Sequence, residues 1–276
     1  MRMFDKGKTV VLAMLFAAGL LFGTGMVNQA GAAIVNGWTL DLSVIDSNLD
    51  TYTNIARVIV DGSANVTQSF GADGVFNDGD TFSEYGMLET ASYRTEAGRL
   101  KPFYLSTGAH DYVLYWKATG LTGQVYDVKP GLTLADTEFK YEFDSGVGTM
   151  GFYLENELGT VYTLATLGII DPSGGQGPAG FLGGAGLNGT TDITARFLTK
   201  YPGVWSDPDG EPMAIGLLNT DNVVTSITPT SGGFVAGIES TGAVKIATPL
   251  PGSVVLLGSG LIGMVSFARM RFGRKK

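Results

Sequence analysis

The hydrophobic positions of this chain follow three patterns along its 276 residues. Two continuous apolar runs lie near the ends, at residues 10–22 and 250–267, and between them apolar and polar residues alternate in short segments. Alternation with a period of two is typical of strands that bury one face. It is clearest at residues 38–44 and 138–144, and in the latter the aromatic residues should face inward. The pattern predicts further strands at residues 55–60, 111–118, 150–154, 161–167, 193–199, 213–218, 234–238 and 243–246.

Turn-forming residues separate these predicted strands. Combinations of Gly, Asn, Asp, Ser, Thr and Pro, which favour tight turns, recur at residues 61–62, 77–80, 119–120, 130–131, 208–210 and 231–233. No segment between the ends keeps a helical period for more than about ten residues. About ten short strands joined by frequent turns favour an all-β fold, here a single jelly-roll-like β-sandwich domain over residues 33–247.

Residues 171–191 are the exception within this domain. The run is rich in glycine and shows no strand alternation. Long loops without regular structure are uncommon unless they are functional or disordered. We therefore predict a long surface loop here, with a role in binding or assembly as the alternative.

The N-terminal run has the features of a secretory signal peptide over residues 1–32. Lys6 and Lys8 precede the apolar stretch, and residues 30–32 are small, as a signal-peptide cleavage site requires. Cleavage near residue 32 would release the rest of the chain on the far side of the inner membrane.

The C-terminal run combines a proline motif, an uncharged apolar segment and a basic tail. As a helix, residues 250–267 would span roughly 27 Å, close to the ~30 Å hydrocarbon core of a bilayer. A helix satisfies its backbone polar groups internally, as lipid requires, so we predict a transmembrane helix. Positive charge favours the cytoplasmic side of a membrane and should hold the tail there. The cations of the tail are Arg269, Arg271, Arg274, Lys275 and Lys276.

These three features, in this order, resemble the PEP-CTERM sorting signal. The motif reads Pro249-Leu250-Pro251-Gly252-Ser253, and the signal covers residues 248–276. Proteins with this signal are processed by exosortase, a membrane enzyme of Gram-negative bacteria that is similar to cysteine transpeptidases. The resemblance therefore implies an exosortase substrate. The usual tripeptide is Pro-Glu-Pro, so this chain looks like a Pro-Leu-Pro variant.

A second resemblance covers residues 197–210. The sequence from Tyr201 through Trp205 to Gly210 is similar to a segment of flocculation-associated PEP-CTERM proteins. This resemblance implies a role in cell aggregation through exopolysaccharide.

Composition excludes several kinds of chemistry. The chain has no cysteine, which rules out disulfides, thiolate metal sites and a cysteine nucleophile. Its single histidine, His110, would have to serve any Ser-His-Asp triad, yet no Gly-x-Ser-x-Gly sequence occurs. We expect His110 to be an ordinary strand or turn residue. The carboxylate pairs Glu142/Asp144 and Glu155/Glu157 should be solvated charges, so we predict no catalytic residue and no enzymatic activity.

The distribution of charge along the chain indicates which partners the domain can bind. The net charge is −8, and because residues 1–32 contribute +2 and the basic tail +5, the domain between them carries −15. An acidic domain repels nucleic acid and anionic lipid. The expected partners are exosortase and the export machinery, the membrane through the C-terminal helix, and exopolysaccharide, with no nucleic acid.

Two groups of residues could bind ligands. Oxygen-rich loops bind hard cations such as calcium, and the alternative for such a loop is plain turn formation. Tyr201 and Trp205 could stack on sugars, with core packing as the alternative. The residues that would hold calcium are Asp73, Asn77, Asp78 and Asp80.

Together, these patterns predict an exported, exosortase-processed protein of the cell surface or extracellular matrix. Its role would be structural or adhesive, in exopolysaccharide, biofilm or floc. It would be anchored in the membrane only transiently and then reach the surface or the medium. A carbohydrate-binding, lectin-like module is the alternative, and a secreted glycan-acting enzyme is the least favoured reading.

Overall fold

Strands dominate the part of the chain that the computed structural model describes, which is residues 32–129, 138–178, 187–207, 210 and 213–249. The all-β prediction is therefore confirmed. Among these residues the 3-10 turn η1 (Leu42–Val44) is the only helical element, and none of them form a helix long and apolar enough to cross a membrane. The strands are β1 (Ala32–Val35), β2 (Trp38–Asp41), β3 (Thr51–Ser69), β4 (Thr81–Thr95), β5 (Leu100–Pro102), β6 (Tyr112–Lys129), β7 (Glu138–Phe143), β8 (Thr149–Asn156), β9 (Val161–Pro178), β10 (Leu187–Lys200), β11 (Trp205–Ser206), β12 (Ile215–Thr230) and β13 (Gly233–Pro249).

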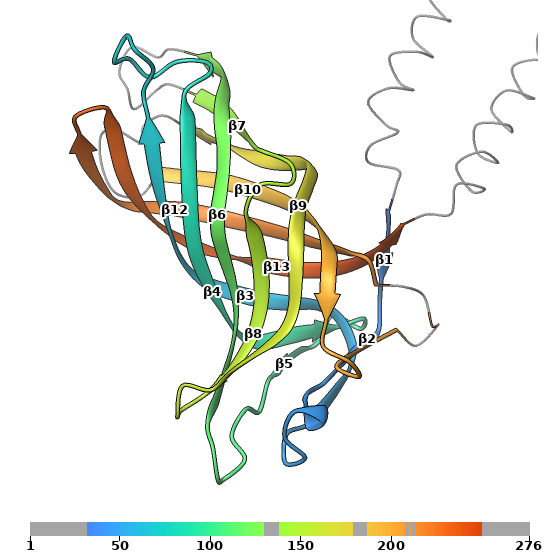
Figure 1. Ribbon diagram of the computed structural model, residues 1–276. Coiled ribbons are helices and arrows are strands. Elements are labelled where there is room, and N and C mark those ends of the chain that lie inside the picture. Colours follow the sequence, from blue (N-terminus) through green and yellow to red (C-terminus); the bar gives the residue numbers. More distant parts are fainter. Residues whose placement is uncertain (1–31, 130–137, 179–186, 208–209, 211–212, 250–276) are drawn as a thin grey trace, which may run out of the picture. The chain divides into compact units, whose positions relative to one another are not determined.

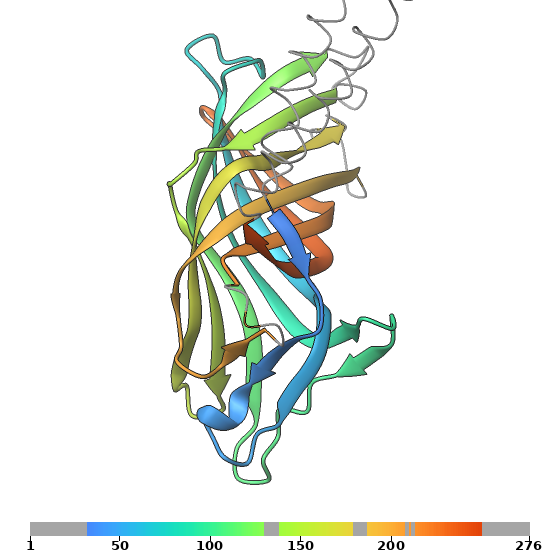
Figure 2. The ribbon, with the colours of Figure 1, turned by 90° about the vertical axis from the view of Figure 1, so that its right-hand side faces the viewer.

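The long strands form one antiparallel sheet that closes on itself. β3 pairs with β4 along one edge and with β13 along the other, from Gly233 opposite Ser69 to Val244 opposite Val58. The ring runs β3-β4-β6-β7-β9-β10-β12-β13 and returns to β3, and β8 shares the place of β7 because both pair with β6 and β9. Figures 1 and 2 show these strands wrapped around a common interior. From the sequence we expected a sandwich of two sheets packed face to face. In the structure the two facing walls belong to one sheet that closes on itself.

β3 and β6 are longer than predicted because two expected turns lie inside them. Residues 61–62 belong to β3, and residues 119–120 belong to β6. The pairing of β3 with β4 shifts register between Ile59 and Asp61, and Gly120 has a φ of 65°. Such irregularities bend a strand without ending it, which the curvature of a closed sheet requires.

The alternation pattern gives no sign of β4, a strand of 15 residues. Its positions that line the interior are Phe82, Glu84, Gly86 and Leu88. A carboxylate and a glycine among them break the apolar period that marks a buried strand face. The residues that hide this strand in the sequence also place one carboxylate, Glu84, in the mainly apolar interior.

The glycine-rich run is strand over much of its length, so the loop predicted for residues 171–191 is wrong there. β9 continues to Pro178, and β10 begins at Leu187. Residues 179–186 lie outside the described residues.

Close approach of two strands explains why glycine occupies this run. Gly175 of β9 lies opposite Tyr141 of β7. A Cβ atom at Gly175 would lie 2.4 Å from the Tyr141 hydroxyl oxygen and 2.0 Å from the Thr190 carbonyl oxygen. Only glycine leaves room for both neighbours, and a strand without side chains shows no alternation in the sequence.

Large aromatic side chains fill one part of the interior. Trp38 stacks on Trp205 with ring centroids 5.5 Å apart, and Phe152 contacts Trp205 at the same centroid distance. Phe152 also stacks on Trp116 at 4.3 Å. Burial of aromatic surface is a large stabilising contribution in such a core. Trp116 also lines the hollow part of the interior, so its ring lies at the boundary between the packed part and the hollow part.

Candidate ligand-binding cavity

The interior of the closed sheet holds a cavity of about 100 Å³, counted as the space open to the centre of a water-sized sphere. Every strand of the ring contributes to its wall. A closed sheet of about eight strands encloses an interior that side chains fill or that holds one small ligand. Here the side chains leave part of that interior open. The aromatic residues of the wall are Phe76, Phe82, Trp116, Phe139, Tyr141 and Phe234.

Several polar groups of the wall residues have no partner among the described residues, and three of them are as follows. Two are buried atoms, Nε1 of Trp116 and Oδ1 of Asn222. The third is the carboxylate of Glu84, which makes no hydrogen bond or ion pair with a described residue. Buried polar groups are normally satisfied by protein, water or ligand, so each exception needs an explanation. A mainly apolar wall with a few polar groups is the usual composition of a small-molecule site.

Glu84 is the only acidic or basic residue among those that line the cavity in the described part of the chain. It is half-buried, because its side chain borders the cavity rather than packed protein. Burial raises the pKa of Glu84 from 4.5 to about 7, since a low dielectric disfavours the charged form. Near neutral pH the side chain is therefore present both as a neutral acid and as a carboxylate.

Tyr141 lies within the electrostatic reach of Glu84 and is held by hydrogen bonds. Burial, and after it the charge of Glu84, raises the pKa of Tyr141. Its hydroxyl donates to the Thr190 carbonyl oxygen over 3.1 Å and lies 2.5 Å from Oγ1 of Thr191. The same Oγ1 accepts a hydrogen bond of 2.5 Å from Nδ2 of Asn222. These bonds fix the tyrosine ring and the asparagine amide against the cavity.

A larger hollow of about 610 Å³ adjoins the cavity. It lies where β6 ends and β7 begins, and its charged lining contrasts with the apolar interior. Lys140 Nζ lies 2.7 Å from Asp127 Oδ2, and this contact lowers the pKa of Asp127. Five residues line both the hollow and the cavity, so the two spaces are neighbours. The residues that line both spaces are Phe139, Gln176, Gly177, Gly189 and Asn222.

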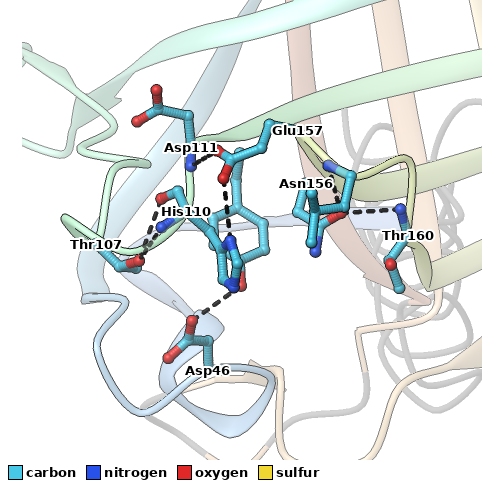
Figure 3. Close-up of polar contacts among 9 residues, drawn as sticks. Asp46, Thr107, His110, Asp111, Asn156, Glu157 and Thr160 are labelled. Atoms are coloured by element: carbon cyan, nitrogen blue, oxygen red, sulfur yellow. Dashed lines mark hydrogen bonds and ion pairs between the residues drawn. The ribbon is translucent and has the colours of Figure 1, made fainter.

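A second polar group lies near the start of β6, at the other end of that strand. Nδ1 of His110 is 3.0 Å from Oε1 of Glu157, whose other oxygen accepts the backbone N–H of Asp111 (Figure 3). The Tyr112 hydroxyl donates to Asp46 over 2.9 Å. The Asp111 N–H and, after it, His110 lower the pKa of Glu157. These contacts join the loops before β6, between β8 and β9, and after η1.

This arrangement agrees with the expectation that His110 is an ordinary turn residue. The Thr107 hydroxyl bonds to the backbone of His110 and not to its ring. Among the described residues no hydroxyl nucleophile is hydrogen-bonded to the imidazole, which pairs only with Glu157. The two side chains are 37% and 42% exposed, so the pair lies at the surface and joins loops.

The residues predicted to hold calcium use their oxygens in hydrogen bonds within their own turn and, at Asp78, to the neighbouring strand β6. Asp80 is buried and accepts backbone N–H groups through both oxygens, one of them from Asn77. Asp73 accepts from Nδ2 of Asn77 over 2.6 Å, and Asp78 accepts a backbone N–H of β6. In the described ranges no three acidic or histidine side chains are placed to hold a metal ion. Calcium therefore stays a prediction, and the hydrogen bonds that are present stabilise this turn and its contact with β6.

The residues predicted to stack on sugars are not a joint platform. Trp205 stacks on Trp38, and its Nε1 donates to the Leu164 carbonyl oxygen over 2.8 Å. Its ring therefore belongs to the core, as the alternative interpretation expected. Tyr201 lies in the turn before β11 and is 36% exposed.

The sorting residues lie almost entirely outside the described part of the chain. Pro249 is the last residue of β13. Residues 250–276, with the rest of the proline motif and the basic tail, and residues 1–31 of the predicted signal peptide are not described. Their roles stay predictions.

The cavity itself was not predicted from the sequence. The available signal was a set of polar residues at inward strand positions, such as Gln68, Glu84, Thr220 and Asn222, and single residues of this kind do not reveal that they share one space. No protein-family model, curated protein or solved structure matches this chain. Its function therefore has to be inferred from its own residues and geometry.

Proposed function

We propose that this chain is an exported protein that binds a small, largely apolar molecule inside its closed sheet. The observation that carries the proposal is the cavity, whose largely aromatic wall contains the carboxylate of Glu84 without a hydrogen-bond or ion-pair partner among the described residues. In such sites apolar burial supplies most of the affinity, and a few polar groups fix the orientation of the ligand. The proposed role is binding without catalysis.

The terminal signals support an exported location for this binding protein. The predicted signal peptide and the PEP-CTERM-like segment would make it an exosortase substrate that ends at the cell surface or in the matrix. In this proposal the ends of the chain determine where the protein goes, and the cavity determines what it binds there. A structural or adhesive contribution to exopolysaccharide, biofilm or floc would depend on the outer surface of the same domain.

A glycan-binding role has weaker support. Of the two residues predicted to stack on sugars, Trp205 packs in the core against Trp38. Tyr201 is 36% exposed and does not pack with Trp205 into a shared platform. The cavity is a defined enclosed site, and a neutral sugar would not match its mainly apolar wall.

Filling the cavity tests the proposal. Val66 lines the cavity, whereas the next residue of β3, Thr67, is exposed on the outer face. Val66→Phe should abolish saturable binding of octan-1-ol, because the added ring occupies the space of the ligand. Thr67→Phe adds the same ring outside and should leave the affinity within about threefold of wild type. Isothermal titration calorimetry measures both, with circular dichroism to confirm the fold.

Three outcomes of this experiment decide whether the ligand binds in the interior. Saturable binding that Val66→Phe removes and Thr67→Phe retains supports the interior site. Absence of saturable binding of octyl compounds of any charge to the wild-type protein would contradict the proposed function. Equal binding by both variants would place the ligand on the outer surface.

A further inference from the structure

The charge within the cavity wall is of one sign. Glu84 is the only carboxylate there, and no lysine, arginine or histidine lines the cavity within the described ranges. A ligand carboxylate would bring a second negative charge into a low-dielectric space with no cation to balance it. A ligand ammonium group would instead provide the counter-charge that Glu84 lacks.

Aromatic rings line the same cavity as this carboxylate. Phe82 lies two residues before Glu84 on β4, and its ring centroid is 5.6 Å from that of Tyr141. Both rings line the cavity, as does Trp116 on the neighbouring strand β6. The faces of aromatic rings attract cations, and the attraction is stronger where water is excluded. An aromatic enclosure with one carboxylate therefore suits an ammonium group better than an anion or a neutral polar group.

The outer charge of the molecule favours the same kind of ligand. The domain between the terminal signals carries −15. The hollow beside the cavity contains Asp127, Glu138 and Asp221 against Lys129 and Lys140. A negative surface raises the local concentration of cations and their rate of association.

From these observations we infer that the ligand is an apolar amine, which binds as its cation with the ammonium group against Glu84 and its hydrocarbon part along the aromatic wall. This inference rests on the proposed function, because it identifies the chemical class that the same cavity takes. It excludes fatty acids and other apolar anions as the preferred ligand.

Binding of such a ligand should depend on pH. Burial raises the pKa of Glu84 to about 7, so the carboxylate form that pairs with an ammonium group becomes more abundant between about pH 5 and about pH 8. Tyr141 is the other titratable group at the cavity, and its raised pKa keeps it neutral over this range. The cavity-lining residues that the neighbouring strands β3 and β6 place around Glu84 do not titrate, and they are Ala64, Val66, Gln68, Trp116, Ala118 and Val125.

The test compares octylamine, octan-1-ol and octanoate, which share one alkyl chain and differ in the charge of the head group. Calorimetric titration of the purified protein, as recovered from expressing cells, gives each affinity at about pH 8. Octylamine should bind at least about tenfold more tightly than octan-1-ol, and octanoate should bind most weakly. Glu84→Gln should weaken octylamine by about tenfold and leave octan-1-ol within about threefold.

A matched control uses Glu89, which lies on the same strand and is exposed. Glu89→Gln removes the same charge from the outer face and should leave all three affinities unchanged. Wild-type binding of octylamine should also strengthen by about tenfold from about pH 5 to about pH 8, a measurement that needs no variant.

Three results would overturn the inference. They are octanoate or octan-1-ol binding as tightly as octylamine, an amine preference that survives Glu84→Gln, and an octylamine affinity that is flat with pH. Failure of all three octyl compounds to bind is a different result, because it would overturn the proposed function itself.

Discussion

At the scale of single residues, Glu84 is the side chain whose environment is hardest to explain by folding alone. It lines an apolar cavity, has no hydrogen-bond or ion-pair partner among the described residues, and has its pKa raised by burial. Ionisation of such a group destabilises the folded state. Strongly perturbed pKa values are concentrated at functional sites. At such a site, a role in binding or catalysis explains why a destabilising group is kept.

Replacing Glu84 should therefore stabilise the protein at high pH. The rise in pKa from 4.5 to about 7 means that the folded state binds the proton more tightly than the unfolded state. The stability of the wild-type protein should fall as pH rises through this interval. Above it, Glu84→Gln should increase the free energy of unfolding by up to roughly 3 kcal/mol. Urea denaturation at about pH 4 and about pH 8 measures the difference, which should be small at the lower pH.

The exposed Glu89→Gln variant is the control for this prediction, because it removes a charge from the solvated face of the same strand. Its stability should follow that of wild type at both pH values. If Glu84→Gln changed the free energy of unfolding by the same amount at both pH values, the pKa of Glu84 would not be raised by burial.

At the scale of elements, the strands β4 and β9 depart from the alternation expected of half-buried strands, each for its own reason. β4 places a carboxylate and a glycine on its inner face. β9 uses glycine where β7 and β10 approach closely, as Gly175 does beside Tyr141. These departures shape the cavity, because they determine which side chains reach the interior.

Adding a single methyl group to β9 should disturb both packing and binding. A Cβ atom at Gly175 would overlap the Tyr141 hydroxyl and a backbone oxygen of β10. Gly175→Ala should lower the free energy of unfolding by about 1–3 kcal/mol, as overpacking does. It should also weaken octylamine binding, because the ring of Tyr141 has to move. Thermal unfolding and calorimetric titration report the two effects.

Gly232 provides the matched control, because no atom lies within 4 Å of a Cβ atom built there. Gly232→Ala should change neither stability nor affinity appreciably. If Gly175→Ala were equally silent, the close packing of β7, β9 and β10 around Tyr141 would not be correct.

At the scale of the whole molecule, the pairing of β3 with β13 decides that the protein has an interior at all. These strands lie near opposite ends of the described chain, and their pairing turns an open sheet into a ring. Closure leaves the ring without free strand edges, which protects against edge-to-edge aggregation. It also encloses the cavity in which the proposed ligand would bind.

The terminal signals are tested at this scale by following the location of the chain. In the proposed pathway, exosortase cuts near Pro249, so intact-mass analysis of the surface-extracted protein should show a chain that lacks the basic tail. Deletion of residues 249–276 should abolish retention at the cell surface. Retention unchanged by the deletion, or a mature chain that still ends at Lys276, would contradict the sorting role. Wild-type protein expressed in the same cells is the reference.

The sequence by itself determined the fold class and the places of many strands, because alternation at segments such as residues 138–144 reflects a local property, one face buried and one solvated. It is also the sole basis for the predicted terminal signals, which are linear motifs. It failed at β4 and at the glycine-rich part of β9, where inward positions hold Glu84 or no side chain. Only the tertiary structure decided that β3 meets β13, that Trp205 belongs to the core, and that Glu84, Tyr141 and Asn222 share one cavity. The physical reason is that a cavity is the space left between strands distant in sequence, and no local pattern records their distance.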